Sequence, residues 1–305
     1  MERSELISIL HSELRTNPWP PKPGQSIEIL CLRSIALRRD NAPEREQRLL
    51  FLERLQGRDG AWPAVIGDEQ QSAWTTALAA LTLMSASRSS APLQRAFRWL
   101  VQSKGREANW FWQWKFRNVD NEVKFDPAKY GWAWMPGTTS WVVPTGMSII
   151  ALQKGRPAGF APAYVLNERI DIGVAMLLDR MCPGGGWNAG NGIAFGVALV
   201  PYIDATAIAL LGLQRQKHEA VDASLLWLST RLRDCPSPYS LAWGILALAT
   251  YQKSGIELSA VLQQASTRLI AAIGNAGTGL DTGTLALCAL ALGAVEGENV
   301  FAVPS

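Results

Sequence analysis

The feature that most constrains the fold of this chain is a short, apolar, helix-forming segment that recurs six times. It is clearest in TALAALTL, which begins at Thr76, and in TLALCALAL, which begins at Thr284. A helix that is apolar on every side has to be buried, because otherwise its apolar surface would contact water. The six segments begin at Ile27, Thr76, Thr145, Thr206, Leu241 and Thr284.

A more polar, amphipathic segment accompanies each apolar one. An amphipathic helix followed by a buried helix is a unit that cannot bury its apolar face alone, so such units stack against one another. Six inner and six outer helices predict an all-α fold, an (α/α)6 barrel or toroid formed by residues 1–305 as a single domain. An open solenoid is the alternative, since periodicity does not reveal closure. The amphipathic segments are expected at about 2–15, 43–56, 91–103, 167–180, 219–233 and 258–273.

The composition is that of a protein with a large core. Hydrophobic residues make up 48% of the 305 and charged residues 18%, with a net charge of +3. Proteins that bind nucleic acid usually carry a basic stripe, so this balance argues against nucleic acid as a partner. The charged N-terminus lacks the apolar core of a signal peptide, and glycine, serine and threonine interrupt the apolar segments. These features predict a cytoplasmic protein without a membrane span.

The cysteines show no metal-site or redox spacing. They are Cys31, Cys182, Cys235 and Cys288, with no CxxC pair among them. Cys31 and Cys288 fall on expected inner helices. Buried, reduced thiols are therefore the expected state, which also fits a cytoplasmic protein.

The turn before the second inner helix carries the clearest local signals. Gly57 and Gly60 accommodate positive φ and Asp59 can bond to neighbouring backbone, so residues 56–62 predict a sharp turn. Thr75 and Thr76 are expected to cap the apolar helix that follows. At the other end of the chain, the short tail after residue 296 is expected to lie across one end of the barrel.

Residues 104–144 form an aromatic-rich, irregular insertion in this pattern. An irregular loop of this length is usually functional. Its rings either seal one end of the barrel or form a lid or wall for an apolar ligand. Partial alternation in WFWQWKF also permits a short hairpin. The tryptophans of this insertion, interleaved with lysines and arginines, are Trp110, Trp112, Trp114, Trp132, Trp134 and Trp141.

A second signal of the fold is the spacing Q-x3-G-x-W, formed by Gln56, Gly60 and Trp62. It resembles the QW repeat of the squalene and hopene cyclases and related terpene cyclases, whose barrel the protein prenyltransferase β subunits share. Gly185 and Trp187 repeat the glycine and tryptophan, although methionine replaces the glutamine there. The resemblance covers most of the chain and implies an (α/α)6 barrel with its cavity at the N-terminal ends of the inner helices.

Class II terpene cyclases protonate an alkene with the middle aspartate of a D-x-D-D-T motif that opens an inner helix. On this chain the motif is matched by Asp204 and Thr206, whereas Tyr202 and Ala205 replace its outer aspartates. The resemblance therefore implies a class II-like isoprenoid cyclase with Asp204 as proton donor. Burial would have to raise the pKa of Asp204, and a hydrogen bond from Tyr202 would oppose this. The other role open to Asp204 is that of an N-cap.

Aromatic faces stabilise the positive charge that forms in such a reaction. The partner implied is an apolar, isoprenoid-like small molecule. No cofactor is expected, except magnesium if the substrate is a diphosphate, which lysines and arginines of residues 104–129 would then hold. The residues expected to line the pocket are Trp62, Trp74, Trp141, Trp187, Tyr202 and Tyr239.

The sequence offers fewer of the residues that zinc-dependent, nucleophilic, thioester or glycosidase sites require. The zinc site of prenyltransferases requires Asp, Cys and His, but His11 and His218 fall on outer helices and Asp234 adjoins Cys235. Neither a nucleophile–histidine pair nor the Cys–Gln motif of thioester barrels is recognisable. A glycosidase needs two carboxylates across a cavity. The carboxylates near turns are Asp59, Asp68, Glu69, Asp126 and Asp281.

The main alternative to a cyclase is a barrel without catalytic activity. It would bind an apolar ligand, or work with a partner subunit as a relative of prenyltransferase β subunits. A lone barrel leaves its cavity open at one end. Peripheral contact of this end with a membrane surface is therefore a further possibility.

Overall fold

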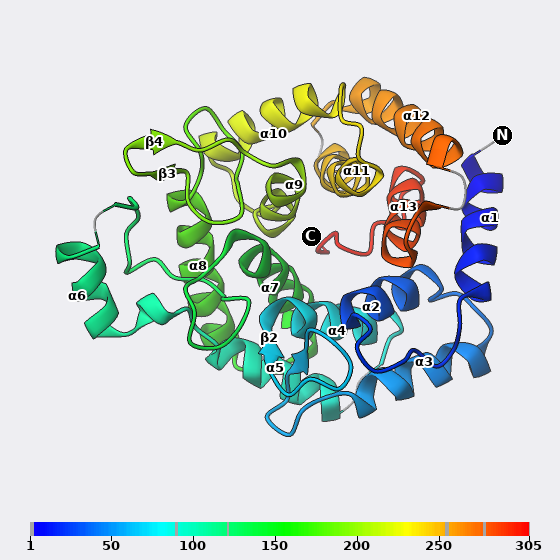
Figure 1. The fold of residues 1–305 in the computed structure, drawn as a ribbon, viewed down its shortest axis with the longest axis horizontal. Coiled ribbons are helices and arrows are strands. Elements are labelled where there is room, and N and C mark those ends of the chain that lie inside the picture. The colour runs from blue at the N-terminus through cyan, green and yellow to red at the C-terminus, as the bar shows by residue number, and fades with distance from the viewer. Residues whose placement is uncertain (1–2, 89–90, 121, 254–255, 277–278, 305) are drawn as a thin grey trace.

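The computed structural model describes residues 3–88, 91–120, 122–253, 256–276 and 279–304, and it consists of two concentric rings of helices (Figure 1). Inner and outer helices alternate along the chain, as the sequence predicts. The inner helices are α2 (Ile27–Ala36), α4 (Ala73–Ser85), α7 (Val142–Gly155), α9 (Ile203–Gly212), α11 (Pro238–Lys253) and α13 (Thr282–Val295). The outer helices are α1 (Arg3–Thr16), α3 (Ala42–Arg54), α5 (Ala91–Gln102), α8 (Ala163–Asp179), α10 (Glu219–Leu232) and α12 (Ser259–Ala276).

The inner ring is closed. Each inner helix packs against the inner helix before it and the one after it, and α13 packs against α2. The outer helix α1 also packs on the inner helix α13, so the first and last helices of the chain are in contact. The fold is therefore an all-α (α/α)6 barrel and not an open solenoid.

The burial of each helix follows from its sequence pattern. In α13 the residues from Gly283 to Leu292 are all buried, as an apolar segment without charged side chains requires. In α5 only Leu93, Ala96, Phe97 and Leu100 are buried, and their spacing places them on one face of the helix. The buried face of α5 packs on the inner helices α4 and α7.

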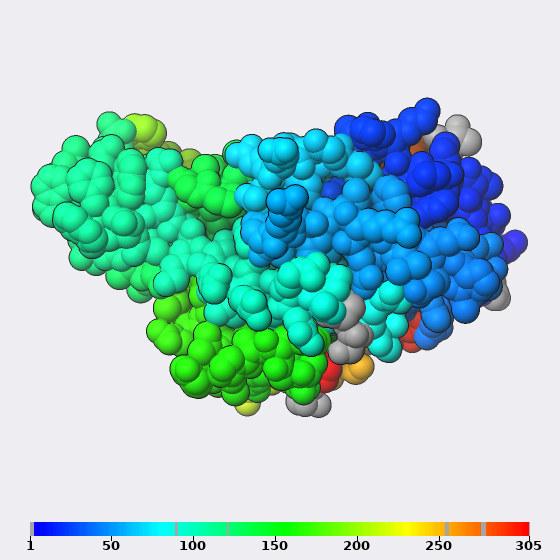
Figure 2. All heavy atoms as spheres, turned by 90° about the horizontal axis from the view of Figure 1, so that it is seen from below, coloured from blue at the N-terminus to red at the C-terminus, as the bar shows by residue number. Residues whose placement is uncertain are grey.

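The aromatic insertion departs from expectation in its local structure. The stretch WFWQWKF lies in a helix, α6 (Trp110–Asn118), and not in a hairpin. The side chain of Asn109 accepts a hydrogen bond from the N–H of Phe111 and so caps this helix. A short 3₁₀-helix, η1 (Arg106–Ala108), precedes it. Together they project from the wall of the barrel, at the left of Figures 1 and 2.

Two pairs of very short strands order the longer turns. Strand β1 (Trp62–Pro63) pairs with β2 (Gln71–Ser72), and β3 (Ile193–Ala194) pairs with β4 (Val197–Ala198), both in antiparallel fashion. An isolated bridge between Val123 and Ala194 ties the insertion to the second hairpin. The 3₁₀-helix η2 (Arg156–Ala158) follows α7.

Thr75 and Thr76 do not cap α4 as expected. The helix begins at Ala73, so both threonines lie in its first turn. Their hydroxyls bond to the backbone of Trp62 instead. Glu2, at the start of the first expected outer segment, and residues 277–278 lie outside the described residues.

The C-terminal tail lies across one end of the barrel, as predicted. Lys154 near the end of α7 donates a hydrogen bond to the carbonyl of Ala302 at 2.8 Å, and Gln214 after α9 accepts one from the N–H of Val303 at 2.8 Å. Phe301 is fully buried there, and Figure 1 shows the chain end at the centre of the ring. The opposite end, where the inner helices begin, is called the barrel mouth below.

Candidate functional site

Trp62 is held between an outer and an inner helix. Its backbone N–H donates a hydrogen bond to the hydroxyl of Thr76 in α4 at 2.9 Å. Its indole N–H donates to the carbonyl of Leu52 in α3 at 2.8 Å, and its side chain is fully buried. Because both of its polar groups bond to helices, Trp62 contributes to the packing between the two rings.

The glutamine and glycine of the Q-x3-G-x-W motif hold the same turn against the next outer helix, α5. The side-chain amide of Gln56 donates to the carbonyls of Gly60 and Pro92, each at 2.8 Å. Gly60 has a φ of +101°, and a Cβ atom there would lie 2.7 Å from the carbonyl oxygen of Arg95. Gly185, at the corresponding later turn, also has a φ of +101°. Glycine is required at both turns because any side chain would clash.

The same connection occurs around Trp187. Its backbone N–H donates to the hydroxyl of Thr206 in α9 at 2.9 Å, and its indole N–H donates to the carbonyl of Leu177 in α8 at 2.6 Å. The side chain is fully buried. Trp62 and Trp187, both expected to line a pocket, therefore occupy equivalent places between inner and outer helices.

Trp132 makes a third such connection, which the sequence analysis missed. Its backbone N–H donates to the hydroxyl of Thr145 at 2.9 Å, and its indole N–H donates to the carbonyl of Leu100 at 2.8 Å. The available signal was a Gly-Trp pair, Gly131 and Trp132, ahead of an apolar segment that begins with threonine.

Trp74 and Tyr239, two of the expected pocket residues, lie at the barrel mouth. Both rings contact Trp243, at centroid distances of 6.2 and 6.4 Å. Trp134 packs on Trp74 from the insertion at 5.9 Å, and Phe301 packs on Trp243 from the tail at 5.2 Å. These rings form a continuous column from the mouth to the tail, in the place where the resemblance implied a cavity.

Glu28, in the first turn of α2, is a mouth residue that the sequence analysis missed. Its carboxylate lies beside the indole N–H of Trp74. This N–H is buried and meets no acceptor at full hydrogen-bond geometry within the described residues. Burial raises the pKa of Glu28, the contact with Trp74 lowers it in part, and the charge of Asp281 raises it further. Such a carboxyl keeps its proton to a higher pH than usual. The signal was an acid in the first turn of an apolar inner helix.

Asp281 lies at the same end of the barrel, but its pKa is shifted in the opposite direction to that of Glu28. It caps α13, because its carboxylate accepts hydrogen bonds from the N–H of Gly283 at 2.8 Å and of Thr284 at 3.0 Å. Burial alone would raise its pKa, but these bonds and one from the Thr284 hydroxyl outweigh it, so the pKa is lowered. Carboxyls with opposed pKa shifts are the arrangement that acid–base sites use.

Asp204 lies near the mouth but does not cap its helix. The N-cap of α9 is Tyr202, and Asp204 is the second residue of the helix. Among the residues that the structure describes, none forms a hydrogen bond or ion pair with the Asp204 side chain. Burial raises the pKa of the Tyr239 hydroxyl, and the charges of Glu28 and Asp204 raise it further, so this hydroxyl stays protonated.

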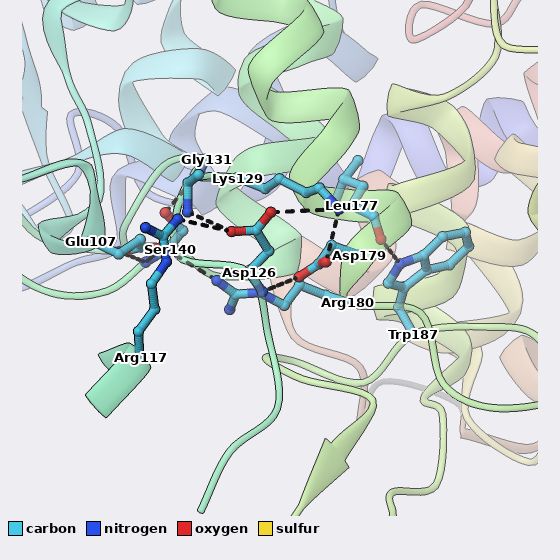
Figure 3. A network of polar contacts seen from close by, with 11 residues as sticks. Glu107, Arg117, Asp126, Lys129, Gly131, Ser140, Leu177, Asp179, Arg180 and Trp187 are labelled. Atoms are coloured by element: carbon cyan, nitrogen blue, oxygen red, sulfur yellow. Dashed lines mark hydrogen bonds and ion pairs between the residues drawn. The ribbon is translucent and has the colours of Figure 1, made fainter. Parts of the chain in front are cut away.

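A second cluster of polar groups lies beside the insertion (Figure 3). The carboxylate of Glu107 accepts hydrogen bonds from the N–H of Ser140 at 3.1 Å and from Nη2 of Arg180 at 3.4 Å. Asp179 pairs with Lys129 at 3.1 Å and lies 3.8 Å from Nε of Arg180. The side chains of Glu107 and Arg180 are almost completely buried.

Trp141, another expected pocket residue, borders a cavity of about 190 Å³ beside Arg180. Tyr202 is 56% exposed. The expected site residues thus fall into separate groups. Trp74, Tyr239 and Asp204 are associated with the mouth, Trp141 lies at the insertion, and Trp62 and Trp187 lie between the rings.

The described residues include no group of three His, Cys, Asp or Glu side chains arranged to hold a metal ion. His218 serves as the N-cap of α10, since its Nδ1 accepts a hydrogen bond from the N–H of Ala220 at 3.0 Å. The four cysteines are buried and free. Burial raises the pKa of Cys31 and Cys288 to about 12, so these thiols stay protonated.

Several basic side chains expected to hold a diphosphate have partners within the insertion or on the neighbouring helix α8. Arg106 lies 4.5 Å above the ring of Trp112 and Lys115 lies 4.9 Å from the same ring. Lys129 pairs with Asp179. Cation–aromatic contacts of this kind stabilise the insertion itself.

The closed double ring defines the class of this protein as an (α/α)6 barrel, and a solved structure supports that assignment. A mutant of Salmonella alpha-2-macroglobulin, which contains an α/α toroid, matches with a TM-score of 0.51 at 13% identity. The match covers 95% of this chain and 17% of the longer protein. At this identity the likeness extends to the fold alone and does not support a terpene cyclase.

No family model matches the chain. No curated protein matches it either. None of the helices in the described ranges has the length and apolarity needed to cross a bilayer.

Proposed function

We propose that the barrel mouth binds a small isoprenoid-like molecule and cyclises it after protonation, as a class II-like terpene cyclase would. The observation that carries this proposal is Glu28, a partly buried carboxyl with a raised pKa beside Trp74. An alkene is a weak base, so its proton donor has to be a carboxyl that is still protonated near neutral pH. Glu28 replaces Asp204 as the donor in this proposal, because burial raises the pKa of Glu28 and its carboxyl lies beside Trp74.

The other mouth residues fit the steps that follow protonation. The Glu28 carboxyl gives its proton to one alkene carbon, and the π electrons form the new C–H bond and leave a carbocation. The faces of Trp74 and Tyr239 stabilise positive charge, and the ionised carboxylate of Asp281 adds to this. A second alkene closes the ring, and loss of a proton from the cyclised cation completes an isomerisation.

The aromatic column restricts the substrate. Trp243, which contacts Trp74, and Phe301, which contacts Trp243, are both fully buried between the inner helices and the tail. A substrate would therefore lie across the mouth and not along the axis. This favours a short isoprenoid over a long polyprenyl chain.

The test compares the wild-type protein with Glu28→Gln, Asp204→Asn and the control Glu168→Gln, which changes an exposed acid on the outer helix α8. Each is incubated with geranyl and farnesyl alcohols and diphosphates, with magnesium for the diphosphates, and products are measured by gas chromatography with mass detection. Glu28→Gln is expected to lower the product yield by about 100-fold or more. Asp204→Asn is expected to retain most of the activity and Glu168→Gln all of it.

A second candidate function is binding without catalysis, which the aromatic rings of Trp74, Trp134 and Tyr239 at the mouth favour. The same ligands, titrated into the wild-type protein while tryptophan fluorescence is recorded, separate the two. Saturable binding without any product would support the binding function and contradict the cyclase. Equal product from the wild type and Glu28→Gln would also contradict protonation by Glu28.

A further inference from the structure

We propose that the cavity beside Arg180 is a separate binding site for a small aromatic amino acid. The cavity has a volume of about 190 Å³ and lies between the insertion, the start of α7 and the glycine-rich turn after α8. Sites for drug-sized ligands are larger, roughly 300–1,000 Å³, so this cavity suits a single-ring molecule. Its lining combines aromatic walls with polar groups of both charges.

The guanidinium of Arg180 indicates where the carboxylate of the ligand would bind. The Arg180 side chain is only 2% exposed, yet the described residues give its guanidinium a single hydrogen bond, the 3.4 Å contact with Glu107. Its Nε is buried without a hydrogen-bond partner in the described part of the chain. A guanidinium has five N–H donors, and buried donors are normally paired.

The neighbouring carboxylates of Glu107 and Asp179 lie 3.4 and 3.8 Å from the Arg180 guanidinium, and each also accepts hydrogen bonds from other donors. Both carboxylate oxygens of Glu107 accept a hydrogen bond from the backbone N–H of Ser140, each at 3.1 Å. The carboxylate of Asp179 accepts hydrogen bonds from the ammonium of Lys129 at 3.1 Å and from the backbone N–H of Asp126 at 2.9 Å. Figure 3 shows this network around Arg180. Burial lowers the pKa of Arg180, and a ligand carboxylate would offset the cost of that buried charge.

A group that accepts hydrogen bonds lines the same cavity. The side-chain oxygen of Asn191 is buried and has no donor within the described residues. Asp120, whose carboxylate also lies 3.4 Å from Nζ of Lys115, and Glu122 line the cavity as well. A ligand ammonium would supply protons to Asn191 and be attracted by both acids. A ligand that carries both a carboxylate and an ammonium matches the positive and negative side chains of the cavity better than a ligand with only one of these groups.

The walls of the cavity select a flat apolar body. Phe116, Phe125 and Trp141 all contribute rings to the lining. Phe116 and Phe125 pack edge to face with centroids 5.2 Å apart. Aromatic walls stack well on another ring, and such pairs add roughly 0.5–1.5 kcal/mol beyond simple burial in folded proteins. An aromatic amino acid therefore complements the rings and the polar groups together.

The experiment is isothermal titration calorimetry of the full chain with L-phenylalanine. Three analogues test the parts of the ligand: 3-phenylpropionate lacks the ammonium, 2-phenylethylamine lacks the carboxylate and glycine lacks the ring. We expect one binding site for L-phenylalanine and affinities at least tenfold lower for each analogue. An analogue that binds as tightly as L-phenylalanine would overturn the assignment of an amino acid.

Variants at the cavity wall test its location without removing the buried Arg180. Thr139→Trp, which fills the cavity, is expected to abolish binding, and Asn191→Ala to weaken it about tenfold. Asn118→Ala, at an exposed amide on α6, is the matched control and should bind like the wild type. The proposal would be overturned if Thr139→Trp bound L-phenylalanine like the wild type. It would also be overturned if titration of the wild-type protein gave no saturable binding heat. Neither result bears on the reaction proposed at the barrel mouth.

Discussion

The hydroxyl of Thr145 accepts a hydrogen bond from the backbone N–H of Trp132 at 2.9 Å, inside the protein. The threonine lies in an inner helix and the tryptophan in the turn that precedes it, and the indole of Trp132 reaches back to the outer helix at Leu100. Three turns in the described part of the chain share this connection. It links an outer helix, a turn and an inner helix, so it fixes how each helical unit folds onto itself.

Thr145→Val tests the contribution of this connection. Valine keeps the shape of threonine but leaves the buried N–H of Trp132 without an acceptor, which is expected to lower the free energy of unfolding by about 1–3 kcal/mol. Chemical denaturation measures the change. Thr230→Val, at an exposed threonine of α10, is the control and should stay within about 0.5 kcal/mol of the wild type. Equal stability of the two variants would show that the bond contributes little.

Trp62→Phe tests whether the repeat tryptophans stabilise the barrel. Phenylalanine loses the indole N–H that bonds to Leu52 and leaves unfilled space in a fully buried position. We expect a loss of roughly 2 kcal/mol or more in the free energy of unfolding. Trp110→Phe, at a side chain that is 77% exposed on α6, should change it by less than about 0.5 kcal/mol.

Phe301→Ala tests the role of the tail. Phe301 is fully buried against Trp243, and truncation of such a ring leaves a cavity, so a loss of about 3–5 kcal/mol is expected. Phe195→Ala removes a ring that is 72% exposed and serves as the control. Thermal unfolding of both variants gives the comparison. A small effect at residue 301 would mean that the tail is not part of the cooperative structure.

The pH dependence of stability tests the surroundings of Glu28. Its raised pKa means that the folded chain holds this proton more tightly than the unfolded chain does. The free energy of unfolding should therefore fall as the pH rises from about 4.5 through the raised pKa. Asp281 has the opposite shift, so its contribution is lost only as the pH falls below 3.8.

Glu28→Gln removes the titrating group and should flatten the pH profile above pH 4.5. Urea denaturation at a series of pH values, with wild type and variant side by side, makes the measurement. Glu168→Gln should keep the wild-type profile, because its side chain is exposed. Parallel profiles for the wild type and Glu28→Gln would contradict the raised pKa of Glu28 on which the proposed reaction depends.

Some of the candidate site could be predicted from the sequence and some could not. Trp74 and Tyr239 were expected at a pocket because they directly precede the apolar segments at Thr76 and Leu241, and both lie at the barrel mouth. Glu28 was missed because its proximity to Trp74 and Asp281 depends on three inner helices that are distant in sequence. The helix α6 was missed because its alternating aromatic residues also fit a strand.

The sequence by itself determined the order of inner and outer helices and the sharp turn at Trp62. Apolar periodicity decides which faces are buried, and glycine is required where φ is positive, so both are local properties of the chain. Only the tertiary structure decided the closure of α13 onto α2, the column of rings around Trp243 and the burial of Glu28. These arise from contacts between segments far apart along the chain, and no local pattern specifies which of them meet.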